Sequence, residues 1–441
     1  MNNAVKTAKR EFNIRAFFEK LMSKSVLDKI FVTLFILFVY RLGCNLSIPF
    51  VNAEAMQAMF GQTSVLDYYN LVSGGALAQC AVFALGVSAY ISASIIIQLL
   101  CVAIPRLEEL TKDVSGKKKI NKITQYVGCG LGAVTAFGYF LAMVRYGAMK
   151  YTSGFPFFVQ AVTVIAILTA GAQIVIWLGW KIDEKGIGNG ISLIIFSGII
   201  SRWDSVISLI TTIVQRGQES GWWNYLMIPA AILFVVAATW YVVHTNNAER
   251  RIAVQYSSKS GAANSFAKRA SYIPLKLIMS GVMPIIFAST ICSLPSLITM
   301  FIDFNKHPSL FLVLASWNSS NWLYVLTYIV LIFCFNRFYI SITFDPDSMS
   351  NNLRMSGGSI PGIRPGKPTA QYLDRNCKAL ATSGSFVLSV VACLPIVAGL
   401  VTGLDIQFGG TSLLIIVGVA LDVVHAIDSD LAVHHRKGFL D

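Results

Sequence analysis

The chain has 441 residues, of which 55% are hydrophobic and only 13% are charged, and its formal net charge is +13. Soluble domains carry about a quarter of charged residues, so this composition excludes an ordinary soluble protein. The charges lie between long apolar runs, and the longest runs exceed the roughly 20 residues that cross the hydrocarbon core of a bilayer. A polytopic membrane protein is therefore expected.

Ten apolar runs follow one another along the chain, and each is predicted to form a transmembrane α-helix. A helix satisfies its own backbone hydrogen bonds inside lipid, whereas the alternating segments of about ten residues typical of a β-barrel are absent from the sequence. The first run ends in Tyr40-Arg41-Leu42-Gly43 and not in a small-residue cleavage site, so we expect no cleaved signal peptide. The predicted spans cover residues 30–48, 80–104, 123–144, 155–180, 187–200, 222–243, 277–302, 322–342, 380–401 and 411–424.

Connections rich in lysine and arginine alternate along the chain with connections that contain few of them. With this set of spans, 29 of the 35 basic residues fall on one side and six on the other. The positive-inside rule places the richer side, with both termini, in the cytoplasm. Ten spans with both ends on one side permit two inverted halves of five, with a pathway between them. The expected organisation is a cytoplasmic segment 1–29, an N-terminal half 30–214, a C-terminal half 215–426 and a cytoplasmic tail 427–441.

Glycine-rich segments interrupt the apolar pattern. Residues 67–77 precede the second span and are too polar for a full crossing. They form either a solvated loop or a short re-entrant element surrounded by protein. Residues 186–192 open the short fifth span, where glycines permit close helix approach or mark a broken helix beside a pathway. In the third span, Gly128-x-Gly130-x-Gly132 resembles a nucleotide-binding fingerprint, but no strand precedes it, which favours helix packing.

Apolar residues recur one helical turn apart in several spans. Such stripes usually face lipid or a protein core. If they converge, they form a constriction that closes a pore by dewetting. Both interpretations stay open for the pairs Val87/Ile91, Ile191/Ile195 and Ile286/Thr290.

Two long loops lie on the basic side, at 244–276 and 343–378. The first contains Glu249-Arg250-Arg251-Ile252, and the second is rich in Gly and Pro, which predicts defined turns. Basic loops commonly do no more than fix orientation. The length of these two favours a further role, as a basic surface for an acidic or RNA-containing partner.

Ionisable groups within the predicted spans are few. Arg41 is expected to snorkel to the outer interface, and Asp422 and His425 lie near the cytoplasmic end of the last span. An ion-coupled pump would be expected to carry paired carboxylates near mid-membrane, and these spans carry none. The eight cysteines are scattered, the histidines of the tail are interpreted as solvated, and no catalytic or nucleotide-binding motif is present. We expect no enzyme activity, no metal and no cofactor.

Longer stretches throughout the chain resemble one membrane-protein family. They are YRLG at 40–43, YNLVSGGALAQCAVFALGVSAYISASIIIQLL at 69–100, KITQY at 122–126, GIGNGIS at 186–192, ERRIAVQY at 249–256, IPLKLIMSGVMPIIFAS at 273–289, PGIRPGKPTAQYL at 361–373 and GGTSLLI at 409–415. These stretches resemble the SecY family, whose members are the central subunits of the bacterial protein-conducting channel.

The resemblance implies an all-α polytopic membrane protein, with ten transmembrane helices in two pseudo-symmetric inverted halves of five around a central hourglass pore. A lateral gate would lie between the second and third spans on one side and the seventh and eighth on the other. The implied plug covers about 66–77, with Leu66, Tyr69, Leu71, Val72, Gly74 and Gly75. The implied pore ring is Val87, Ile91, Ile191, Ile195, Ile286, Thr290 and Ile415. The implied docking residues are Arg250, Arg251, Arg364 and Lys367.

The function implied by the resemblance is passage of unfolded secretory polypeptides across the bacterial cytoplasmic membrane, with lateral release of membrane spans into lipid. Implied partners are small membrane subunits of the SecE and SecG type, the SecA motor ATPase, the ribosome with its RNA, signal peptides, nascent chains and lipid. The alternative is a secondary transporter with inverted repeats for a small solute, and an intramembrane enzyme is third. The lack of mid-span charge and of a nucleophile/base constellation disfavours both.

Two positions depart from the family pattern. The family usually has proline before Tyr90, where this chain has Ser88-Ala89, so the resemblance alone predicts no kink there. A basic residue often follows KITQY, where this chain has Val127-Gly128, which weakens the expected motor contact at that place.

Overall fold

A computed structural model shows a mainly helical chain with one small sheet. It describes residues 24–52, 70, 73–112, 114–145, 147–151, 154–201, 211, 214–215, 227–256, 271–299, 317, 321–402 and 410–437. Its helices are α2 (Lys24–Asn45), α5 (Ser88–Ala103), α6 (Pro105–Lys112), α7 (Val114–Arg145), α8 (Phe155–Lys185), α9 (Gly190–Ile200), α11 (Met227–Asn246), α12 (Met283–Thr299), α14 (Trp322–Thr343), α15 (Pro346–Met355), α16 (Lys367–Thr402) and α17 (Gly410–Lys437). Its strands are β1 (Glu249–Tyr256), β2 (Ser271–Lys276) and β3 (Gly358–Ser359).

Each of the ten predicted apolar runs contains a helix. Among the described residues, five helices are long and apolar enough to cross a membrane: Ser115–Arg145, Phe155–Lys185, Trp322–Met355, Lys367–Leu394 and Ser412–Asp430. Shorter apolar helices are Ser88–Ala103, Gly190–Ile200, Ile232–Asn246 and Met283–Pro295. The first predicted run lies in α2, which has 22 residues.

The second predicted span was wrong at its start, because α5 begins at Ser88 and not at residue 80. The preceding stretch consists of tight turns, with a left-handed φ of 52° at Gly86. It also pairs with the end of α2, since the Val82 N–H donates to the Leu46 carbonyl over 2.8 Å. Hydropathy reports that these residues are apolar and says nothing of their backbone conformation.

The seventh predicted span also begins later than expected. Helix α12 starts at Met283, and residues 277–282 form bends and turns in which Gly281 has a φ of 61°. An L-residue with a side chain rarely adopts this conformation, so the glycine sets the start of α12. We call residues 277–282 the connector.

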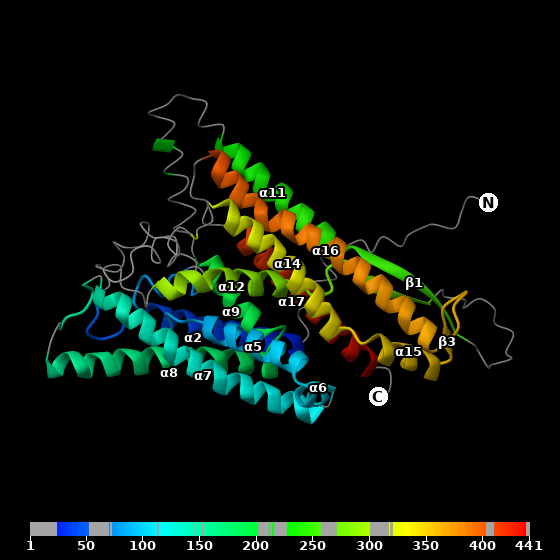
Figure 1. Cartoon of the computed structure of the whole chain (residues 1–441), viewed down its shortest axis with the longest axis horizontal. Coiled ribbons are helices and arrows are strands. Elements are labelled where there is room, and N and C mark those ends of the chain that lie inside the picture. Colours follow the sequence, from blue (N-terminus) through cyan, green and yellow to red (C-terminus); the bar gives the residue numbers. More distant parts are fainter. Residues whose placement is uncertain are drawn as a thin grey trace.

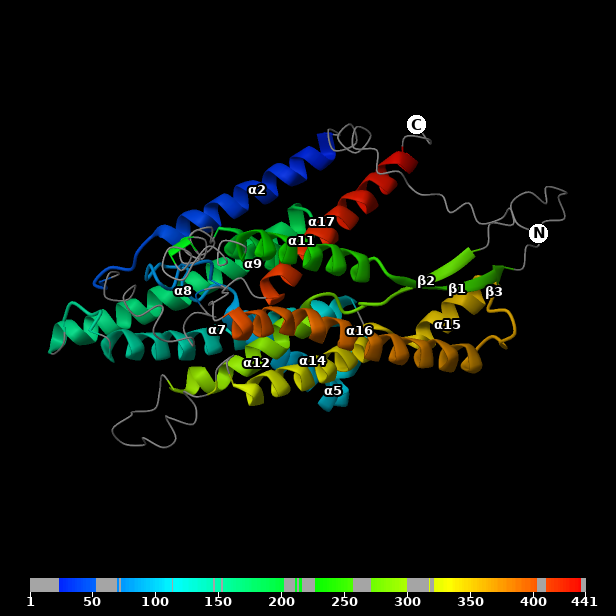
Figure 2. The same cartoon turned by 90° about the horizontal axis from the view of Figure 1, so that it is seen from above.

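The helices form two groups that follow the order of the chain. In Figures 1 and 2, α7 and α8 run side by side in the N-terminal group, and α14 and α16 do so in the C-terminal group. The groups meet where α5 packs on α12, and where α2 and α9 pack on α17. The main hydrophobic core spans this junction, and a second core lies within the N-terminal group.

A three-stranded antiparallel sheet lies at one end of the molecule, beside α15 (Figure 1). Strand β1 pairs with β2 over six residues, from Glu249↔Lys276 to Val254↔Ser271, and with β3 at Gln255↔Ser359. The described parts of the two long basic loops therefore form one unit, with its own core that includes Ile252, Leu353 and Leu373. The all-α expectation missed this sheet.

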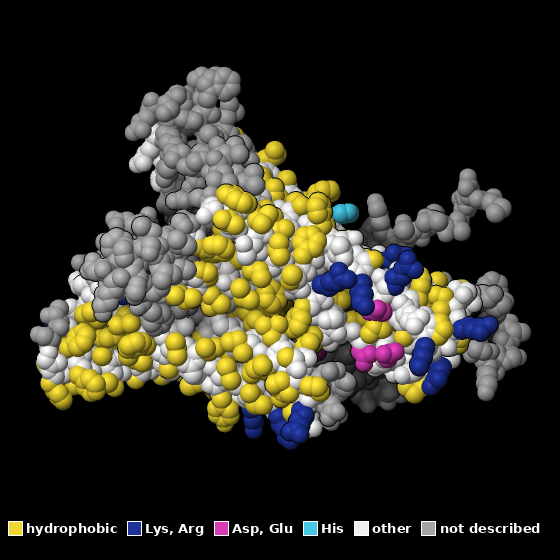
Figure 3. All heavy atoms as spheres, viewed as in Figure 1, with side chains coloured by type: hydrophobic (Ala, Val, Ile, Leu, Met, Phe, Trp, Pro, Cys, Tyr) yellow, Lys and Arg dark blue, Asp and Glu magenta, His cyan; other side chains and the backbone are white. Residues whose placement is uncertain are grey.

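Charge and apolar surface are separated along the molecule. In Figure 3, hydrophobic side chains cover the helices, while Lys and Arg gather at the sheet end and along the lower edge. Large exposed apolar side chains on the helices include Phe31, Phe137, Trp177 and Trp240. Exposure on this scale is typical of a lipid-facing surface.

Candidate functional site

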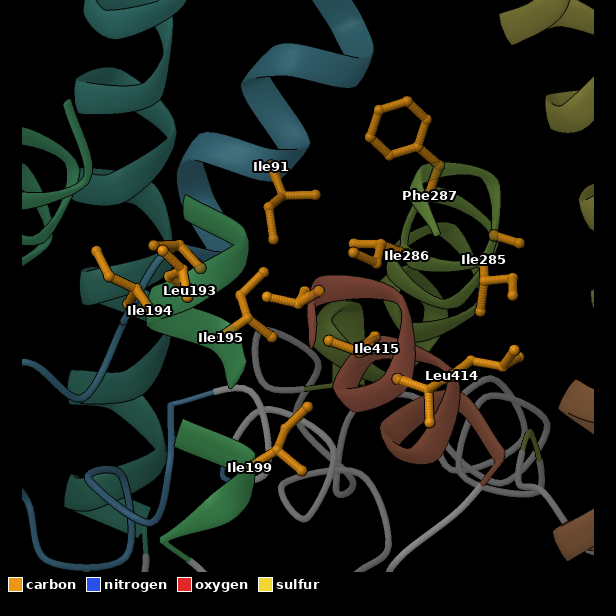
Figure 4. Packing of buried hydrophobic residues seen from close by; sticks show 14 of the residues in the cluster. Ile91, Leu193, Ile194, Ile195, Ile199, Ile285, Ile286, Phe287, Leu414 and Ile415 are labelled. Atoms are coloured by element: carbon orange, nitrogen blue, oxygen red, sulfur yellow. The ribbon is translucent and has the colours of Figure 1, made fainter. Parts of the chain in front are cut away.

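The residues of the predicted pore ring come together in the structure. Val87 directly precedes α5 and Ile91 lies in its first turn; the remaining residues lie on α9, α12 and α17. All except Ile191, which is half-buried, are at most 7% exposed, and the apolar ones belong to or pack against the main hydrophobic core. Figure 4 shows Ile91, Ile195, Ile286 and Ile415 pointing toward one another from four helices.

This cluster joins the two helix groups. Ile91 and Ile195 come from the N-terminal group, and Ile286 and Ile415 come from the C-terminal group. Branched aliphatic side chains pack without hydrogen-bonding groups, so their contact excludes water and can be separated without leaving an unpaired polar atom. The arrangement is therefore suited to a closable constriction.

Helix α12 places hydroxyl groups next to the cluster. Thr290 is buried, and its Oγ1 donates to the Ile286 carbonyl over 2.7 Å. Ser289 donates to the same carbonyl over 2.9 Å, and Ser293 donates to the Thr290 carbonyl over 2.7 Å. Each hydroxyl is thus satisfied by its own helix, a pattern that often bends helices. Pro295 follows within the same helix and removes a further backbone donor.

The predicted plug is only partly within the described residues. Gly74 and Gly75 are described, with left-handed φ values of 69° and 87°. The other four proposed plug residues, Leu66, Tyr69, Leu71 and Val72, lie outside the described residues.

The described part of the glycine-rich segment is buried against α2 and α9. Ser73 is 1% exposed, and its carbonyl accepts a hydrogen bond from the Tyr40 hydroxyl over 3.4 Å. The Arg41 guanidinium donates to the Gly74 carbonyl over 3.3 Å. A Cβ added at Gly74 would lie 2.7 Å from the Gly198 Cα of α9. This burial agrees with an element surrounded by protein and disagrees with a solvated loop.

The glycines of residues 186–192 permit both a close helix crossing and a chain break. A Cβ added at Gly190 would lie 2.0 Å from the Gly179 carbonyl oxygen of α8. Gly188 has a φ of 78° in the turn between α8 and α9. The new helix is capped, because the Asn189 side chain accepts from the Ser192 N–H and the Asp183 carboxylate accepts from the Gly190 N–H over 2.6 Å.

The four predicted docking residues are all exposed. Arg251 donates from Nε to Glu249 Oε1 over 2.6 Å, and its guanidinium lies 4.8 Å from the Tyr272 ring centroid. The hydrogen bond with Glu249 raises the pKa of Arg251 above its ordinary value. Arg364 lies in the turns before α16, and Lys367 begins that helix.

Comparison with known proteins gives the family. The family model SecY matches residues 81–424. The chain belongs to the SecY family. "Protein translocase subunit SecY" of Streptomyces scabiei is 35% identical over 97% of this chain and 100% of the relative. "Protein translocase subunit SecY" of Thermotoga maritima is 35% identical over 94% of both chains.

Solved structures of low sequence identity share the fold. "The structure of a protein conducting channel" has a TM-score of 0.61 at 17% identity and covers 91% of both chains. "Sec61 in the Canine ribosome-channel complex from the endoplasmic reticulum" has a TM-score of 0.57 at 16% identity and the same coverage. As a SecY family member, this chain is a mostly helical, multi-pass protein of the bacterial membrane that acts in protein translocation.

The cysteines and the possible metal ligands add no candidate site among the described residues. All eight cysteines are free, and in the part of the chain that the structure describes no group of three or more His, Cys, Asp and Glu side chains is placed to hold a metal ion. Sequence analysis missed Asn336, a fully buried amide in α14. A lone Asn within an apolar run gives no periodic pattern. It becomes noticeable only through its hydrogen bonds to residues distant in the sequence.

Proposed function

We propose that this SecY family chain forms the polypeptide-conducting pore itself, with ten membrane spans in two inverted halves, 30–214 and 215–426. The pore ring is the constriction of an hourglass. The observation that carries this proposal is the meeting of Ile91, Ile195, Ile286 and Ile415 in one buried apolar cluster at the junction of the two helix groups.

An apolar ring suits a channel for many different sequences. Ile and Val side chains offer no fixed hydrogen-bond pattern, so they select no particular polypeptide. They also adapt to a passing chain while excluding water and ions. The plug at about 66–77 adds a second barrier, and the buried position of Ser73 and Gly74 beside α2 and α9 supports it.

The lateral gate of the proposed channel lies at the contact of α5 with α12. Separating these helices opens the pore toward lipid, so that a signal peptide or a nascent membrane span partitions into the bilayer. The hydroxyl groups of α12 that bond to its own backbone, a pattern that often bends helices, support a helix that moves.

Partners supply the driving force and the docking site. We infer that the sheet end faces the cytoplasm with both termini, and that Arg250, Arg251, Arg364 and Lys367 bind the SecA motor or ribosomal RNA. Two structural neighbours are described as ribosome complexes, from the canine endoplasmic reticulum and from yeast. Small subunits of the SecE and SecG type are further expected partners, beside the lipid-facing helices.

A secondary transporter is disfavoured. Ion-coupled transport uses charged groups inside the membrane, and among the described residues no Asp, Glu, Lys or Arg is buried.

Reconstitution tests the proposal. The chain is placed in liposomes with its small membrane subunits, and ATP- and SecA-dependent import of a secretory precursor is measured by protease protection. We expect import that stops when SecA is left out. Uptake of a small solute without any precursor import would defeat the channel proposal and favour the transporter.

A further inference from the structure

The connector joins the docking surface to the pore ring. It begins directly after β2, where the Leu277 N–H donates to the Ala248 carbonyl over 2.8 Å. Ile278 belongs to the main core that contains the pore ring, whereas Met279 packs against the core of the sheet. Ile286 lies only seven positions after Met279 along the chain. This short segment therefore links the sheet directly to α12.

Asn336 of α14 holds the connector through a closed polar network. The Asn336 side chain is fully buried. Its Nδ2 donates to the Ala381 carbonyl and to the Ser385 Oγ of α16, both over 2.8 Å. Its Oδ1 accepts a hydrogen bond from the Ser280 hydroxyl. One amide therefore links α14, α16 and the connector.

Close packing holds the connector against the same helices. A Cβ added at Gly384 of α16 would lie 2.6 Å from the Leu277 carbonyl oxygen. Phe287, next to Ile286, packs edge-on against Phe335 and Tyr339 of α14, with ring centroids 6.0 and 6.4 Å away. Helix α14 thus contacts the connector before Gly281 and α12 after it.

We propose that Asn336 is a positioning residue that holds α12 in the closed position and makes opening depend on docking at the sheet. The inference rests on the proposed function. In the closed arrangement every hydrogen-bonding group of the amide except one lone pair has a partner. Moving Ser280 breaks the link between α14 and the connector and releases α12 about Gly281. A buried network that is either complete or broken gives two discrete positions and not a continuous range.

The test uses three variants with closely matched chemistry. Asn336→Leu removes all three hydrogen bonds and keeps the number and branching of the side-chain heavy atoms. Ser280→Ala removes only the bond to the connector. Ser383→Ala is the control, because Ser383 is an exposed serine of α16 whose hydroxyl donates only to the Ala379 carbonyl of its own helix.

The first measurement is ion leak through the reconstituted channel without SecA or precursor. We expect leak to rise about tenfold in Asn336→Leu and about threefold in Ser280→Ala, since single interhelical hydrogen bonds in membranes are modest. Ser383→Ala is expected to match the parent chain.

The second measurement separates positioning from simple destabilisation. In the parent chain, Arg251→Glu is expected to lower SecA-dependent import strongly. In the Asn336→Leu background, Arg251→Glu is expected to lower SecA-dependent import much less, because opening no longer depends on docking. If Asn336 only stabilised the fold, Asn336→Leu would lower the amount of folded channel. Arg251→Glu would then lower import by the same factor in both backgrounds.

The outcomes are distinct. If precursors are imported and both Asn336→Leu and Ser280→Ala match Ser383→Ala in leak and in docking dependence, the inference is overturned and the proposed function stands. If Asn336→Leu does not fold, Ser280→Ala alone decides in the same way. If the parent chain imports nothing, the proposed function fails instead.

Discussion

Gly190 of α9 lies against Gly179 of α8 so closely that a Cβ added at Gly190 would be 2.0 Å from the Gly179 carbonyl oxygen. That carbonyl belongs to helix backbone and cannot rotate away. The contact fixes the position of α9, which carries Ile191 and Ile195 toward the pore ring. Gly190 therefore positions the pore-ring residues of α9 by allowing the close contact between α8 and α9.

Gly190→Ala is expected to destabilise the protein by about 3 kcal/mol, because a methyl group forces α8 and α9 apart. Gly130→Ala in α7 is the matched control, since nothing lies within 4 Å of a Cβ added there. Thermal unfolding in detergent measures the difference. Equal midpoints for the two variants would show that the α8–α9 crossing is looser than described.

Substituting Asn for a pore-ring isoleucine is expected to loosen the seal. Ile286→Asn or Ile415→Asn introduces an amide that attracts water into the constriction. Ion leak should rise, and precursors with defective signal peptides should be imported. Ile298→Asn on α12 is the control, because Ile298 is 49% exposed and lies away from the cluster. Unchanged leak and unchanged signal selectivity in both ring variants would place the pathway elsewhere.

A translocating polypeptide is expected to pass through the pore ring and contact its side chains. A photo-crosslinking amino acid at Ile191 or Ile286 should form an adduct with a stalled precursor. The same probe at Trp177, which is 53% exposed on α8, should react with lipid or small subunits and not with the precursor. Adducts at Trp177 alone would contradict the central pathway.

The sequence predicts where helices form far better than where they begin. Lipid leaves few alternatives for an apolar run, so every run contains a helix. The starts of α5 and α12 depend on local backbone conformation at Gly86 and Gly281, which hydropathy does not report. Glycine in an apolar run is the only sequence feature that suggests such a break.

The sheet was missed because its signal is short and non-local. Buried Ile252 and Val254 alternate with exposed residues in β1. A strand also needs a partner, and Gln255 pairs with Ser359 more than one hundred residues later. The pore residues were placed by resemblance and not by pattern, because spacing alone favours a lipid-facing or core position over pore lining. Asn336 gave no pattern at all, since its three bonds reach residues 280, 381 and 385.

Reversing charge at the sheet end is expected to weaken docking. Arg251→Glu and Arg364→Glu should each reduce affinity for SecA or for ribosomes by about tenfold at physiological salt, and should flatten the dependence of binding on salt concentration. Lys150→Glu is the control, because this exposed lysine follows α7 at the opposite end of that helix from the Lys117–Lys119 cluster. Binding is measured by co-sedimentation of proteoliposomes with ribosomes or SecA at several salt concentrations. An equal loss in Lys150→Glu would mean that net charge controls binding, and no loss in either arginine variant would remove the sheet from the docking site.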